Sequence, residues 1–331
     1  MRHGFFYAFV ILLLTSPLFY SFASVSIYDL QPSVLEVIDR FNTPDILGEL
    51  TIITDPEQLP AEGKSSKEVW TGPYFPVNNN GTAVAMKKYD IATNNGGRAY
   101  NWESENNRRI GNVSWAGHCN GLAAAAINER GPKHSVNYHG VTFSVDDIKA
   151  LLVEAYQNST GVSRLVGLRC NSDSSATDSY GRNNDPSCRD LNPASFHLII
   201  TNYLGIHGMP VIIDENMGLP VWNYAIKKYS YSYKILDARG AATALGADRY
   251  IFNRDAKYFL KVHMTLQSAS GKSFKYDYIL EGSEQQQIVG GEWLGKSKSE
   301  HPDFIWRQNQ MNTENPYLNI EVIKEIASYA Q

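Results

Sequence analysis

Hydrophobic residues recur at helical spacing in three stretches of the chain. An alanine-rich run, closed by Gly131-Pro132, predicts a helix from about residue 119 to residue 129. A second helix is predicted over residues 142–158 and a short amphipathic one over residues 319–330. In the second helix, four apolar side chains fall on one face: Ile148, Leu151, Leu152 and Ala155.

Shorter apolar or alternating runs fill most of the rest of the C-terminal two thirds. Alternation of apolar and polar residues is typical of half-buried strands. The run that contains Ser195 to Thr201 is ambiguous between strand and helix, and we predict a strand there. An α+β fold is therefore expected, in which a helix packs on an antiparallel sheet with strands at residues 195–201, 210–216, 221–236, 258–266, 274–280 and 287–293.

The N-terminal third divides into two parts. Residues 1–23 have the pattern of an export signal, with Arg2 and His3 before an apolar run too short to span a bilayer and small residues before Ser24. Residues 24–110 contain many breakers, so an irregular accessory region is expected ahead of a catalytic domain at residues 111–331. We therefore expect a secreted or periplasmic protein with no stable membrane insertion after cleavage of the signal. The alternative is that residues 1–23 remain as an uncleaved anchor.

Composition narrows the function classes. The net charge is −4, the pI is about 6.1, and no basic run occurs, so a nucleic-acid partner is not expected. Charged residues make up only 19% of the chain, while 20 tyrosines raise the aromatic fraction to 12%. This composition is typical of an exported, folded protein with an aromatic-rich sheet.

Three cysteines are present, which is an odd number for an oxidising compartment. Cys170 and Cys188 flank a polar loop, and pairing them would contribute about 3 kcal/mol in the chain-entropy model. Cys119 is then left unpaired, and a leftover cysteine in a secreted chain suggests a reactive thiol or an intermolecular bond. Other pairings of the three remain open.

Cys119 lies where a nucleophile would be expected, directly ahead of the alanine-rich helix. Unpaired backbone N–H groups and the positive end of the helix dipole favour the thiolate at that place. Gly117 and Gly121 leave room for a substrate acyl group. The alternative is a buried free cysteine, which behaves as a small apolar residue.

A cysteine nucleophile needs a base and a group that orients the base. Papain-type enzymes place a histidine on a later strand and an Asn or Asp on the next. Here His197 begins one apolar run and Asp214 ends the following one, so Cys119, His197 and Asp214 are the predicted catalytic residues. His301 is the alternative base, and His118 could tune the charge of the neighbouring thiol. The plainer alternatives are a core histidine and a turn aspartate.

The expected oxyanion site begins with the backbone N–H of Cys119, and Asn112 and Trp115 are candidate side-chain donors. An aromatic cleft that favours an amine over water as acceptor could be lined by Trp70, Trp115 and Trp222. Each of these tryptophans could equally belong to the core.

At these residues the chain resembles the transglutaminase elicitors of oomycetes and their bacterial relatives. The resemblance rests on Trp115-Ala-Gly-His-Cys-Asn-Gly-Leu-Ala-Ala-Ala125, Pro193-Ala-Ser-Phe-His197, Val221-Trp-Asn223, Gly290-Gly-Glu-Trp293 and His301-Pro-Asp-Phe304. It implies a papain-like core, a nucleophile at Cys119 and acyl transfer from protein glutamine.

Two features depart from the family. Tyr224-Ala225-Ile226 follows Val221-Trp-Asn223, where the elicitor peptide would continue with Gln-Pro, so elicitor activity is in doubt. The oomycete enzymes depend on calcium, which makes calcium the one cofactor to consider. The acidic residues of the 171–187 loop do not have EF-hand spacing and are first read as a solvated loop: Asp173, Asp178 and Asp185.

The sequence therefore predicts an exported transglutaminase-like acyltransferase, a protein-glutamine γ-glutamyltransferase in type. Cys119 would form an acyl-enzyme with a protein glutamine and pass the acyl group to a lysine or a small amine. A papain-like cysteine peptidase or amidase using the same three residues is the alternative. An exported binding protein with a degenerate core is a further one.

Overall fold

The computed structural model describes residues 42–48, 50–111, 113–158, 163–169, 191–215, 218 and 220–331. Contacts divide the chain into Met1–Val37 and Ile38–Gln331, and the described residues all belong to the second unit. The predicted export signal lies outside the described residues, as do Asn112 and the Cys170–Cys188 loop. No helix among the described residues is long and apolar enough to cross a membrane.

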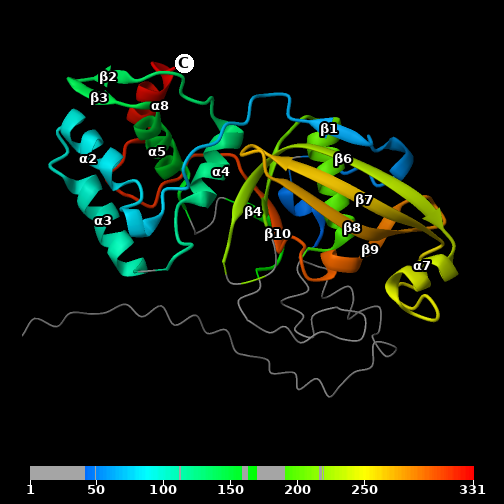
Figure 1. Ribbon diagram of the computed structural model, residues 1–331. Helices are drawn as coiled ribbons and strands as arrows, with labels where there is room; N and C mark the ends of the chain where they lie inside the picture. Colours follow the sequence, from blue (N-terminus) through cyan, green and yellow to red (C-terminus); the bar gives the residue numbers. More distant parts are fainter. Residues whose placement is uncertain are drawn as a thin grey trace, which may run out of the picture. The chain divides into compact units, whose positions relative to one another are not determined.

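The centre of the unit is a curled, eight-stranded sheet whose strand pairs are antiparallel (Figure 1). Seven strands follow the order β4-β10-β5-β6-β7-β8-β9, and β1 pairs with β6. The strands are β1 (Glu62–Lys64), β4 (Ser163–Gly167), β5 (Val211–Asp214), β6 (Asn223–Leu236), β7 (Tyr258–Ser268), β8 (Ser273–Gly282), β9 (Ile288–Trp293) and β10 (Phe304–Gln308).

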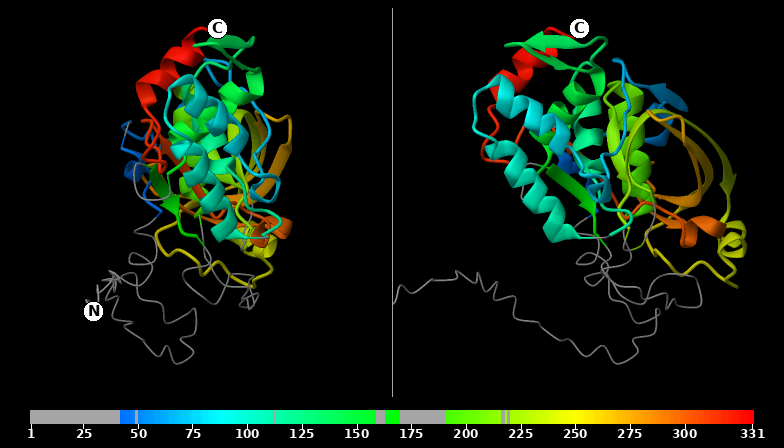
Figure 2. Two further views of the ribbon diagram at one scale, coloured as in Figure 1. Left: turned by 90° about the vertical axis from the view of Figure 1, so that its left-hand side faces the viewer. Right: turned by 60° about the vertical axis from the view of Figure 1, so that its left-hand side comes forward.

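Several helices and a small hairpin pack at one end of this sheet, and further helical segments lie along the rest of it (Figures 1 and 2). The α-helices are α2 (Ala83–Ala92), α3 (Arg98–Ile110), α4 (Cys119–Asn128), α5 (Val145–Tyr156), α6 (Pro193–Ile199), α7 (Ala238–Leu245) and α8 (Ile320–Ser328). Helix α6 continues as a π-helix, η6 (Ile200–Ile206), and the hairpin consists of β2 (Val136–Tyr138) and β3 (Val141–Phe143). The described residues also contain four short 3₁₀ segments: η2 (Pro44–Leu47), η3 (Pro56–Gln58), η4 (Val77–Asn79) and η7 (Gly295–Lys298).

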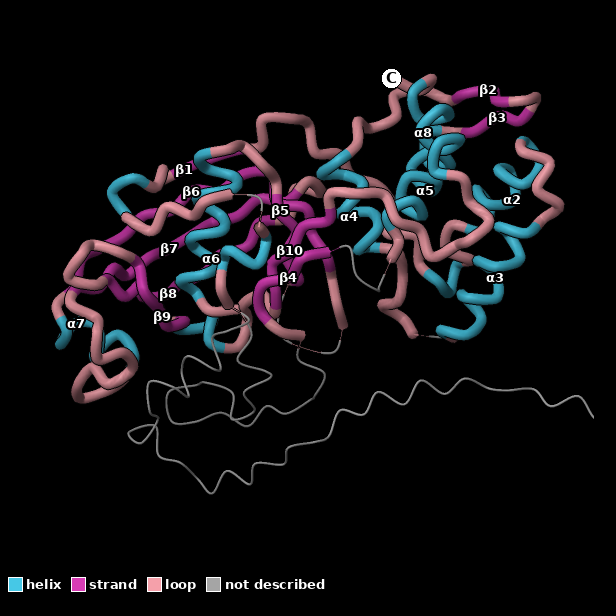
Figure 3. Tube along the Cα trace, turned by 180° about the vertical axis from the view of Figure 1, so that it is seen from behind, coloured by secondary structure: helices cyan, strands magenta, loops and turns pink. Residues whose placement is uncertain are grey.

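Helices α4 and α6 lie on opposite faces of the sheet. Successive side chains of a strand point to opposite faces. On β5, Ile212 packs into the hydrophobic core that contains the alanines of α4, whereas Val211 and Ile213 pack into the second core, with Phe196 of α6. Figure 3 shows α6 in front of the sheet when the molecule is seen from behind. This two-sided packing decides which predicted site residues can meet.

The predicted helices at residues 119–129, 142–158 and 319–330 are confirmed as α4, α5 and α8, with shorter bounds. The strands predicted from residue 210 to residue 293 are confirmed as β5 to β9. The strand predicted over residues 195–201 is wrong, because the segment is helical. Asn192 caps the backbone N–H of Ala194, and Pro193 fits the first turn, so local start signals favour helix.

The segment expected to be an irregular accessory region contributes two helices, α2 and α3, that were not predicted. Its described part, from residue 42 on, packs into the same unit as the rest, since β1 pairs with β6 and α2 packs on α5.

Candidate functional site

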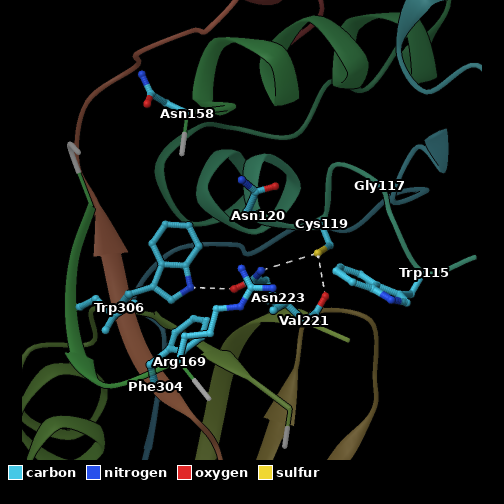
Figure 4. Close-up of a pocket in the computed structure, with 11 residues that line it drawn as sticks. Trp115, Gly117, Cys119, Asn120, Asn158, Arg169, Val221, Asn223, Phe304 and Trp306 are labelled. Carbon is cyan, nitrogen blue, oxygen red and sulfur yellow. Dashed lines mark hydrogen bonds between the residues drawn. The ribbon is translucent and has the colours of Figure 1, made fainter. Parts of the chain in front are cut away.

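Cys119 is the first residue of α4 and lines a pocket of about 270 Å³ (Figure 4). Its thiol is free and its side chain is partly exposed. The pocket lies between the start of α4 and the strands β4, β6 and β10. Its other lining residues are Trp115, Gly117, Asn120, Asn158, Leu165, Arg169, Val221, Asn223, Phe304 and Trp306.

Two polar groups at the start of β6 contact the sulfur of Cys119. The Cys119 thiol donates to the backbone oxygen of Val221 at 3.6 Å, and the Asn223 side-chain amide donates to Sγ at 3.6 Å. The Trp306 indole N–H donates to Asn223 Oδ1 at 2.8 Å. Because an indole N–H is only a donor, it fixes the orientation of the amide and leaves the NH₂ group towards the sulfur. The sulfur thus faces a fixed hydrogen-bond donor.

Close packing holds the start of α4 in place. A Cβ at Gly117 would lie 2.5 Å from the ring of Tyr74, and the His118 N–H donates to the Tyr74 carbonyl at 2.7 Å. A Cβ at Gly121 would lie 2.5 Å from the backbone oxygen of Val153 in α5. The glycines therefore allow the close approach of neighbouring segments, and do more than open space for substrate.

Asp214 ends β5 and pairs directly with Asn223 across the β5–β6 ladder. Opposed residues of an antiparallel pair point to the same face, so Asp214 lies on the face that Cys119 occupies. Its Oδ1 accepts the backbone N–H groups of Trp222 and Glu215, and its Oδ2 has no hydrogen-bond partner among the described residues. Burial raises the pKa of Asp214 to about 7, although these two hydrogen bonds oppose the rise.

This raised pKa gives a pH dependence of stability. The folded chain keeps the Asp214 proton up to about pH 7, whereas the unfolded chain releases it near the ordinary value of 3.8. The stabilisation is therefore complete at low pH and is lost as the pH rises through 7. Asp214→Asn mimics the protonated group and does not lose this stabilisation. The unfolding free energy of the variant minus that of the wild type should therefore increase by about 2–3 kcal/mol between pH 5 and pH 8.

Denaturant unfolding of both proteins at the two pH values measures this difference. The comparison with the wild type is needed because burial also lowers the pKa of His197 to about 3 and of His301 to about 4. Those two histidines make the wild type and the variant alike less stable as the pH falls below 6.5. An equal difference at pH 5 and pH 8 would contradict the raised pKa.

His197 lies in α6, on the far face of the sheet from Cys119, and is fully buried. Its Nδ1 forms a hydrogen bond of 2.8 Å with the Tyr278 hydroxyl, and the ring packs edge-on against Tyr231. No hydrogen bond joins it to Cys119 or Asp214 in the described part of the chain. The structure therefore brings Asp214 to the face of Cys119 and does not bring His197 there, because the adjacent-strand placement expected for His197 is wrong.

In this position His197 is expected to act on stability alone. Removing a buried ring that packs between aromatic residues should cost about 3 kcal/mol, so His197→Ala should lower the unfolding free energy by that amount. The rate at which iodoacetamide alkylates Cys119 in the folded variant should stay at the wild-type value. Unfolding and alkylation measured on the same preparation separate the two effects, and a change in alkylation without a change in stability would contradict this placement.

His301, the alternative base, is also buried away from the pocket. Its ring stacks on Trp293 with centroids 4.9 Å apart, and its Nδ1 hydrogen-bonds to the Ser297 carbonyl at 2.7 Å. None of the described histidines lines the Cys119 pocket. These are His118, His134, His139, His197, His207, His263 and His301, which leaves only His3 outside the described residues.

His118, next to Cys119, turns away from the pocket into a buried cluster. Its Nε2 lies 3.1 Å from Glu103 Oε1 and 3.2 Å from Glu154 Oε1, and its Nδ1 donates to the Phe75 carbonyl at 2.9 Å. Burial opposes a charge on the ring, but the two carboxyl groups outweigh it and hold the pKa of His118 well above its usual value. The Thr82 hydroxyl donates to Glu154 Oε1 at 2.8 Å.

The three tryptophans expected in the cleft have different surroundings. Trp115 lines the pocket, whereas Trp70 is buried and donates to the Glu129 carbonyl, and Trp222 packs edge-on against Tyr74. Trp306 and Asn223 are two pocket residues that the sequence does not single out as site residues. The motif Val221-Trp-Asn223 was noticed, but only the strand register shows that Asn223 faces the cysteine.

Comparison with known proteins gives two matches. Residues 106–324, more than half of the chain, match the model of the transglutaminase elicitor family. The crystal structure of the GP42 transglutaminase from Phytophthora sojae is similar to this one, with a TM-score of 0.71 and 21% sequence identity over 88% of this chain and 98% of that chain. At this sequence identity, the similarity between the two structures is a similarity of fold. No match was found among the sequences of curated proteins.

Proposed function

The chain belongs to the transglutaminase elicitor family, and from this membership and its Cys119 pocket we propose that it is an exported, transglutaminase-like acyltransferase. The observation that carries the proposal is the sulfur of Cys119, which lies at the start of a helix and opens into a pocket beside a fixed amide donor. Protein glutamine would be the acyl donor, and a lysine or a small amine would be the acceptor. A papain-like arrangement of the core is part of the same proposal.

The reaction has two balanced steps. In the first, Sγ of Cys119 attacks the carbon of a glutamine side-chain amide, the C–N bond breaks, and ammonia leaves with the thiol proton. In the second, a primary amine attacks the thioester, the C–S bond breaks, and the amine gives a proton back to the sulfur. Hydrolysis differs only in that water replaces the amine, so the pocket must favour amine over water. Aromatic walls from Trp115 and Trp306 would support that preference.

Asn223 would assist by donating hydrogen bonds. A fixed N–H donor beside the reacting carbon stabilises the negative charge that develops on the carbonyl oxygen, a contribution of about 3 kcal/mol in well-studied enzymes. The backbone N–H of Cys119 is the second donor, since no side chain caps the start of α4. An amide cannot take up a proton, however, and so Asn223 cannot act as the base.

The same residue sets the expected speed of the reaction. In papain-type enzymes the catalytic residues follow one another along the chain as cysteine, histidine and Asn or Asp. The histidine is the base, and it lies on a strand beside the cysteine. We infer that Asn223 occupies the corresponding place in this chain, because its amide contacts the sulfur and Asp214 lies opposite on the neighbouring strand. General base catalysis contributes about 10²–10⁴-fold to a rate. Acyl transfer by this chain should therefore be at least about 10²-fold slower than by an enzyme of the same type that has a histidine base.

Asn223 also favours a second candidate function, which is binding without turnover. A pocket that retains the sulfur and the donor but lacks an imidazole can hold a glutamine-type amide and leave it intact. This candidate predicts that a glutamine-containing peptide binds to the chain and is recovered unchanged.

Incubation with a glutamine-containing peptide and a labelled primary amine tests the proposal. Acyl transfer predicts labelled peptide and released ammonia in equal amounts. Peptide acid without label would support the hydrolase instead, and unchanged peptide after prolonged incubation would support the binding protein. Both latter outcomes contradict the acyltransferase, and an equilibrium binding measurement with the peptide distinguishes a binding site from an inert pocket.

A further inference from the structure

Behind the nucleophile, three ionisable side chains from three helices converge on one buried place. Glu103 comes from α3, His118 from the start of α4 and Glu154 from α5, and each is at most 5% exposed. One nitrogen or oxygen atom from each lies within 4.8 Å of the others. None of the three lines the Cys119 pocket, so the cluster is separate from the site already described.

From this convergence we propose that Glu103, His118 and Glu154 form a binding site for a divalent transition-metal ion. The contact distances fit: His118 Nε2 lies 3.1 and 3.2 Å from the two carboxylate oxygens. Ligand atoms about 2.0–2.2 Å from one ion in tetrahedral geometry stand about 3.2–3.6 Å apart. The two distances to His118 Nε2 therefore need only small changes for the atoms to share one ion, and the two carboxylate oxygens lie within 4.8 Å of each other.

The surrounding hydrogen bonds are those that orient metal ligands. A ligating histidine usually donates its other ring N–H to a backbone carbonyl or a carboxylate, which fixes the tautomer. The Nδ1 of His118 does so to Phe75, leaving Nε2 to face the carboxylates. Thr82 likewise holds Glu154 Oε1. Both ligand side chains are thus fixed before an ion binds.

Polar atoms without partners point to the same place. Among the described residues, Glu154 Oε2 and Asn107 Nδ2 are buried and have no hydrogen-bond partner. Asn107 is itself 8% exposed. A Cβ built on Gly81 would lie 3.0 Å from Asn107 Nδ2, 3.1 Å from Glu103 Oε1 and 2.7 Å from the His118 ring, so Asn107 faces the cluster. With its amide turned over, its oxygen would be the fourth ligand.

A metal ion would balance the charges of the cluster. Two ionised carboxylates facing one imidazolium would leave a negative charge in the core, which is costly and which either a proton on one carboxylate or a divalent ion removes. A divalent ion with two carboxylates and a neutral imidazole is balanced. One nitrogen and a few oxygens suit Zn²⁺ or Mn²⁺, whereas Ca²⁺ takes six to eight oxygen ligands. The ion would join α3, α4 and α5 directly behind Cys119.

Equilibrium titration of the full mature chain with Zn²⁺, Mn²⁺ and Ca²⁺, each alone, tests the proposal. One equivalent of Zn²⁺ or Mn²⁺ is expected to bind and to raise the melting temperature, with Ca²⁺ at least about 100-fold weaker. Glu154→Gln and Glu103→Gln should each weaken binding at least about 100-fold, and Thr82→Val, one shell further out, about 10–100-fold. Glu281→Gln, a buried glutamate bonded to Tyr250 and Asn253, is the matched control and should bind normally.

Two further measurements keep the result independent of folding and of the thiol. Cys119→Ala should bind the ion as the wild type does. X-ray absorption of the Zn²⁺-loaded wild type should show one imidazole and oxygen ligands without sulfur. Absence of binding, binding unchanged in Glu154→Gln, or sulfur in the coordination shell would each overturn the proposal.

Discussion

Replacing Asn223 by histidine is expected to raise the rate of amine incorporation by about 10²-fold or more. The new imidazole would lie where the Asn223 amide now contacts the sulfur, 3.6 Å away. Asp214 lies opposite on β5, fully buried and with Oδ2 unpartnered among the described residues, and it could accept the second ring N–H. The variant would then hold cysteine, base and orienting carboxylate on one face of the sheet.

The gain should depend on Asp214. In a double variant, Asn223→His with Asp214→Asn, most of the increase should disappear, because the imidazole would lose the group that fixes its tautomer. Asn223→Ala is the matched control and should be slower than the wild type, since it removes the donor and supplies no base. Initial rates of amine incorporation at saturating peptide measure all four proteins. A folded histidine variant no faster than the wild type would contradict the inference that position 223 is the place of the base.

Removing the sulfur is expected to have the largest effect of any single substitution. In the same assay, Cys119→Ala should reduce amine incorporation by at least about 10³-fold, because no other group can carry the acyl intermediate. Cys119→Ser should be nearly as slow, since a hydroxyl without a base is a poor nucleophile. The neighbouring pocket residue Asn120 supplies the control, and Asn120→Ala should keep activity within about 10-fold of the wild type.

Substrate binding should survive the loss of the sulfur. The pocket walls do not depend on Sγ, so Cys119→Ala should bind the glutamine peptide with an affinity close to that of the wild type. Residual incorporation by Cys119→Ala at the wild-type rate, with the peptide still bound, would place the chemistry on another residue.

The position of Cys119 at the start of a helix could be predicted from the sequence because its signals are local. A cysteine followed by an alanine-rich run predicts both the helix and the exposed start of that helix, and the structure has α4 begin at Cys119. The later strands were found for the same reason, since alternation repeats within each segment. The wrong prediction at residues 195–201 was also local. The apolar run was read as a strand, although Asn192 and Pro193 just ahead of it favour the start of a helix.

The residues that contact Cys119 could not be predicted in this way. Asn223 reaches Cys119 through the register of β5 with β6, and the choice of sheet face depends on a single residue of register. Likewise, Glu103 and Glu154 are 51 residues apart in the chain and meet only through the packing of α3, α4 and α5. The order of residue types along the chain suggested His197, but the sheet separates that histidine from the cysteine.

The most direct test of the central claim is the mass of Cys119 after incubation of the wild type with a glutamine-containing peptide and no amine. The account predicts an adduct equal to the peptide minus ammonia, held as a thioester on the tryptic fragment that contains Cys119, slow to form in the wild type and faster in Asn223→His. A Cys119 that stays unmodified in both proteins, or an adduct on a different residue, would contradict the account.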